Sequence, residues 1–137
     1  MGFYVHLQVS WGGGSSVAVP QIARKHLEKL TCKDKETFNE AHWFFESVIS
    51  GKSFFGGPKG DFWAWGVIGN YTNVEEFIEL TKPFFMELYK CGELLEHDRV
   101  IFQCEPEQNE SVSIYQLSSD GNVEEFSSGG KWFWGQF

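Results

Sequence analysis

The chain has 137 residues, of which 18% are aromatic, and it carries a formal net charge of −8. This length predicts one domain that can bury a core without a metal or disulfides. The charge is uneven: residues 1–70 hold seven Lys/Arg and six Asp/Glu, whereas residues 71–137 hold four and thirteen. That excess of carboxylates argues against a nucleic acid as partner, because affinity for nucleic acids depends largely on Lys and Arg.

The cysteines and the hydropathy pattern predict a cytoplasmic protein. Cys32, Cys91 and Cys104 are odd in number and form no C-x-x-C motif, so we expect three reduced thiols. Charges interrupt every apolar run well before the ~20 residues of a membrane-spanning helix, so we expect no membrane partner. The N-terminus alternates apolar and polar residues without a basic region, which is not typical of a signal peptide.

The first half of the chain predicts a strand, two helices and a second strand. Residues 3–11 alternate between apolar and polar, the pattern of a half-buried strand. One helix begins near Pro20, which suits a first helical turn. Another spans residues 35–50, where apolar residues recur at helical spacing. Residues 62–69 are apolar on both alternating faces and predict an interior strand.

The second half predicts one long helix followed by strands. The helix begins at residue 74, and Pro83 should kink or restart it because proline lacks the backbone donor. Gly92 is a suitable end, and Asp120-Gly121 predicts a hairpin. The remaining strands are predicted at residues 99–104, 111–117, 123–126 and 131–137.

These elements predict a single α+β domain over residues 1–137. We expect an antiparallel or mixed sheet of about five strands, packed by three helices on one face, in the order β-α-α-β-α-β-β-β-β. The apolar stripes of the two longest helices predict five almost fully buried residues, which are Phe38, Phe45, Phe77, Phe84 and Leu88. Trp43 and Phe44 widen one stripe, so we expect that helix to be buried on more than one side.

Motifs for catalysis or metal binding do not emerge. His42 and Glu46 lie one helical turn apart, but no third ligand accompanies them, so a surface contact is the simpler interpretation. The Gly51-Lys52-Ser53 run ends like a phosphate loop, yet Glu46 stands where that loop needs its first Gly. No nucleophile is found beside a base. We therefore expect no enzyme activity, no catalytic residues, no cofactor and no metal.

Two surfaces are candidates for function. The first is acidic and suits a basic protein partner; its candidate residues are Glu75, Glu79, Glu93 and Glu96. The second is an aromatic and polar sheet face that can stack on a small ligand or a sugar ring; its candidate residues are Tyr4, His6, Trp63, Trp65, Trp132 and Trp134. The competing interpretation places both Trp pairs in the core, since Trp is highly buried on average.

In its size, its acidic run from Glu75 through Glu125 and its aromatic-rich composition, the chain resembles the small acidic immunity proteins of bacteria. Bacteria carry such proteins beside polymorphic or contact-dependent toxins. The resemblance rests on these overall properties and implies a non-catalytic inhibitor of a cognate toxin, often a basic nuclease. The alternative function is a small-ligand or carbohydrate-binding module that uses the Trp-bearing sheet face.

Overall fold

The computed structural model describes residues 5–12, 17–50, 62–69, 74–106 and 113–127. Its elements are β1 (Val5–Gly12), α1 (Ala18–Glu28), α2 (Lys35–Ser50), β2 (Phe62–Gly69), α3 (Val74–Lys90), β3 (Val100–Pro106), β4 (Ser113–Leu117) and β5 (Val123–Ser127). The predicted order is confirmed over these elements. The strand expected at residues 131–137 lies outside the described residues. None of the described helices combines the length and apolar character that crossing a membrane requires.

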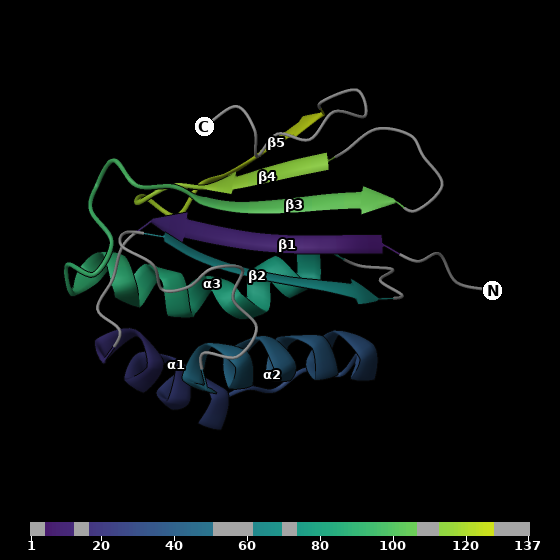
Figure 1. Cartoon of the computed structure of the whole chain (residues 1–137), viewed down its shortest axis with the longest axis horizontal. Coiled ribbons are helices and arrows are strands. Elements are labelled where there is room, and N and C mark those ends of the chain that lie inside the picture. The colour runs from purple at the N-terminus through teal and green to yellow at the C-terminus, as the bar shows by residue number, and fades with distance from the viewer. Residues whose placement is uncertain (1–4, 13–16, 51–61, 70–73, 107–112, 128–137) are drawn as a thin grey trace.

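The strands form one antiparallel sheet in the order β2-β1-β3-β4-β5. Its three helices lie on the same side of the sheet (Figure 1), which confirms the predicted α+β class. Although β1 comes first in the chain, it lies inside the sheet, between β2 and β3. Its apolar positions Leu7, Val9 and Trp11 are accordingly buried on the helix side.

Trp11 is at the centre of the core. Its ring packs edge-on against three phenylalanines, with centroid distances of 6.0 Å to Phe44, 6.2 Å to Phe84 and 5.1 Å to Phe85. Edge-to-face pairs bring the positive edge of one ring to the negative face of another, which adds to the effect of buried area. The first strand therefore joins α2 and α3 through aromatic contacts.

Four of the five predicted core residues are fully buried: Phe45, Phe77, Phe84 and Leu88. The prediction for Phe38 is wrong, because it lies in the first turn of α2 beside His42 and stays half-buried. Burial of α2 on several sides is also wrong. Phe44 is fully buried, whereas the adjacent Trp43 keeps 49% of its surface exposed on the outer side of the helix.

Individual residues explain where α2 begins and where α3 ends, and Pro83 lies within α3. Asp34 caps α2 by accepting hydrogen bonds from the backbone N–H and the hydroxyl of Thr37. Gly92 ends α3 with a φ of +88°, which a residue with a side chain rarely adopts. Of the predicted kink or restart at Pro83, the restart does not occur, because α3 is one helix and carries the exposed Pro83 inside it, and the kink stays a prediction. Exposure lets water reach the carbonyl that loses its helical donor there.

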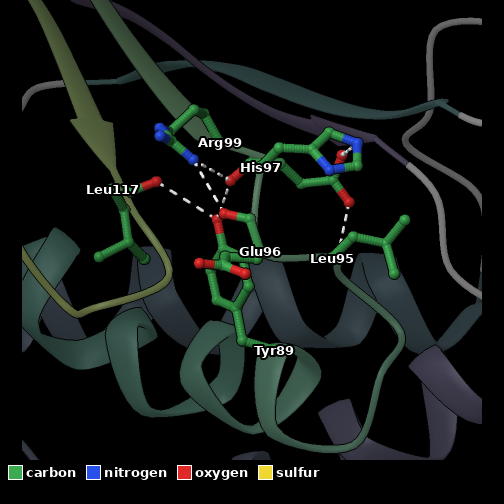
Figure 2. A network of polar contacts seen from close by, with 7 residues as sticks. Tyr89, Leu95, Glu96, His97, Arg99 and Leu117 are labelled. Atoms are coloured by element: carbon green, nitrogen blue, oxygen red, sulfur yellow. Dashed lines mark hydrogen bonds and ion pairs between the residues drawn. The ribbon is translucent and has the colours of Figure 1, made fainter.

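Polar contacts fix the connection from α3 to β3 (Figure 2). The Tyr89 hydroxyl lies 2.5 Å from the carbonyl oxygen of Asp98 and 3.4 Å from that of Leu117. The Asp98 carboxylate accepts a 2.7 Å bond from the N–H of Leu95, and Arg99 donates to the carbonyls of Glu96 and Asp98. Burial raises the pKa of Tyr89 to about 12, so its hydroxyl stays a donor at neutral pH.

Candidate functional site: an acidic cavity beside the β4–β5 hairpin

A cavity of about 340 Å³ lies between the first turns of α3 and the β4–β5 hairpin. Its lining residues are Glu75, Ile78 and Glu79 from α3, Tyr115 from β4, and Val123 and Glu125 from β5. The helical residues share a face because they are spaced three and four apart. Tyr115 and Glu125 are paired across the two strands, so they share a face of the sheet. We call this site the acidic cavity.

The acidic cavity has an apolar floor and a charged rim. Ile78 is 2% exposed and belongs to the core, and Val123 packs against that core. The carboxylate-bearing residues Glu75, Glu79 and Glu125 are exposed. No Lys, Arg or His is among the described residues that line the cavity. The arrangement suits a group with an apolar stem and a cationic end.

Tyr115 adds a neutral hydroxyl to the charged rim. Its pKa is raised to about 12, first by burial and then by the carboxylates of Glu125 and Glu75. The nearby Glu125 carboxylate thus favours the protonated, neutral phenol. At neutral pH Tyr115 is therefore an uncharged donor that also keeps lone pairs free to accept.

The ion pairs of the described residues lie away from this rim. Lys25 and His26 of α1 contact Glu87 at 2.5 Å and 2.7 Å, and His42 contacts Glu46 at 3.3 Å. Within the same part of the chain, no cationic side chain forms an ion pair with the rim carboxylates. The N-terminus of α3 contributes only about half a positive charge. The charged groups among the described lining residues are therefore all carboxylates.

The structure brings together two of the four acidic residues predicted as partner-binding. Glu75 and Glu79 both line the acidic cavity. Glu93 and Glu96 follow the far end of α3, and Glu96 is drawn in Figure 2. Because α3 has 17 residues, its ends are separated by roughly 25 Å. The predicted acidic surface is therefore divided between the two ends of one helix.

Two residues of the site were missed by the sequence analysis: Tyr115 and Glu125. The hairpin signal located the turn but not the register. A two-residue turn at Asp120-Gly121 would pair Tyr115 with Phe126, whereas the observed loop is one residue longer and pairs Tyr115 with Glu125. Alternation along each strand then assigns both residues to the helix-covered face.

The structure describes the predicted aromatic ligand face only in part. Three of its residues lie outside the described part of the chain: Tyr4, Trp132 and Trp134. In the β1–β2 register, the position of Trp63 is opposite Trp11. Trp65 is opposite Val9, so both Trp positions belong to the helix-covered face. The position of His6 belongs to the other face, since successive strand positions alternate.

The remaining predictions from sequence concern a His–Glu pair, metal binding and the cysteines. The His42–Glu46 pair is an exposed contact between successive turns of α2. No group of three or more His, Cys, Asp or Glu residues that could hold a metal ion occurs among the described residues. Cys32, Cys91 and Cys104 are all free thiols, as predicted.

Comparison with known proteins finds no matching family model, no matching curated protein and no matching solved structure. The chemistry of the acidic cavity is therefore the guide to function. Its volume is near the lower end for small-ligand sites, which range over about 300–1,000 Å³. That is enough room for one long side chain or one small organic cation.

Proposed function

We propose that the protein is a non-catalytic, protein-binding inhibitor that docks a basic protein partner at the acidic cavity. The observation that carries this proposal is the rim of Glu75, Glu79 and Glu125 above an apolar floor. In keeping with the resemblance to bacterial immunity proteins, the partner is a cognate toxin, with a basic nuclease as the best match in charge. In this proposal the protein acts in the bacterial cytoplasm, where its thiols stay reduced.

Charge and apolar contact have separate roles in this proposal. A net charge of −8 attracts a basic partner over distance and raises the association rate at low salt. Within contact distance, the stem of a Lys or Arg packs on Ile78 and Val123 while its charged end reaches the rim. The attraction sets the rate of encounter, and the buried stem slows dissociation.

The test uses the protein encoded by the neighbouring gene as partner. Its association with the parent chain and with a Glu75→Lys/Glu79→Lys variant is measured by stopped flow at about 20 mM and about 300 mM NaCl. We expect the reversal to lower the association rate about ten-fold or more at low salt and to flatten its salt dependence. Co-expression should also protect cells from the partner if that partner is a toxin.

The matched control is Glu93→Lys/Glu96→Lys, which makes the same change in net charge at the other end of α3. We expect it to slow association much less than the reversal at the cavity. If both variants slow association equally, the attraction depends on the net charge of the protein and not on the position of the carboxylates. If both variants associate at the parent rate with the parent salt dependence, the acidic cavity is not the docking site.

The alternative, a small-ligand or carbohydrate site on the Trp-bearing sheet face, stays a prediction. A neutral sugar site responds little to salt, because screening acts on charges. The same two salt concentrations therefore separate the two functions: a ligand that binds equally well at both, and that tolerates Glu75→Lys/Glu79→Lys, favours the alternative.

A further inference from the structure

We draw no further inference here: the strongest candidate, the fully buried Gln103 side chain on the sheet face opposite the helices, has an amide without a hydrogen-bond partner among the described residues, but nothing in the structure shows what covers it.

Discussion

The two ends of α3 carry the same acidic residue type in opposite circumstances. At the C-terminal end, Glu87 accepts contacts of 2.5 Å from Lys25 and 2.7 Å from His26, which join α3 to α1. At the N-terminal end, Glu75 and Glu79 line a cavity whose described lining residues include no basic side chain. The charge of Glu87 is therefore compensated by residues of α1, whereas the charges of Glu75 and Glu79 face solvent and are available to a partner.

This difference separates structural carboxylates from candidate functional ones. The hydrogen bond from Lys25, followed by that from His26, holds the pKa of Glu87 below its ordinary value. A paired carboxylate stabilises the fold, and its removal leaves the partners without an acceptor. A carboxylate on the rim of the acidic cavity gains no such stability, so its removal should affect binding more than folding. Variants at both ends of α3 test this separation.

The largest effect on the free energy of unfolding is expected in the hydrophobic core against which α3 packs. Phe77 is fully buried between Phe44 and Phe102, with ring centroids 6.0 Å and 6.5 Å away. Phe77→Ala should lower the free energy of unfolding by about 3–5 kcal/mol, because it leaves a cavity among aromatic rings. Urea unfolding measures the change. Phe126→Ala removes the same side chain from an exposed strand position and should cost under about 1 kcal/mol. A similar cost for both variants would contradict the assigned core.

The next effect concerns the hydroxyl that fixes the C-terminal end of α3. Tyr89→Phe leaves the carbonyls of Asp98 and Leu117 without this donor and should cost about 1–3 kcal/mol. Tyr115→Phe is the matched change at the acidic cavity. It should cost less than about 1 kcal/mol, because the neighbouring Glu125 carboxylate is exposed and is solvated by water with or without the hydroxyl. If Tyr115→Phe cost more than Tyr89→Phe, the hydroxyl at the acidic cavity would be the one that stabilises the fold.

A smaller loss of stability is expected when the pH is lowered. The pKa of Glu87 is lower in the folded state than in the unfolded state, so its contribution is complete above the unfolded pKa. That contribution is lost as the pH falls through the folded pKa. Glu87→Gln should therefore be less stable than the parent chain by up to about 1 kcal/mol near pH 6, and this difference should disappear as the pH falls towards 3. Urea midpoints of both proteins between about pH 6 and pH 3 measure this, and parallel curves would contradict it.

The sequence predicted elements well where one periodicity runs without interruption. The bounds expected for α2 and β2 are those of the structure. The sequence predicted less well which side of each helix packs against the core. Phe44 and Trp43 are neighbours with similar apolarity, and only the packing of α2 against Trp11 makes one buried and the other exposed. The persistence of α3 through Pro83 likewise depends on which side of the helix is exposed.

Half of the acidic site was predictable from the helix alone. Glu75 and Glu79 share a helical face by spacing, and no tertiary information is needed to group them. Glu125 joins them only because β5 packs beside α3. Glu93 follows the C-terminal end of α3, and the 17-residue length of the helix separates it from the cavity at the other end. Local spacing is readable from sequence, whereas distances between elements come from packing.

The smallest effect on stability is expected at the acidic cavity itself. Glu75→Gln/Glu79→Gln removes a like-charge pair one turn apart, which should stabilise α3 by about 0.2–0.5 kcal/mol. It also removes negative charge near the positive end of the helix, which should cost a similar amount. The net change should stay within about 0.5 kcal/mol and shrink further at high salt, because salt screens both terms. Glu87→Gln, the same substitution at the paired end, should cost more. A loss above about 1 kcal/mol for the double variant would assign these carboxylates to the fold and remove the reason for treating their charge as available to a partner.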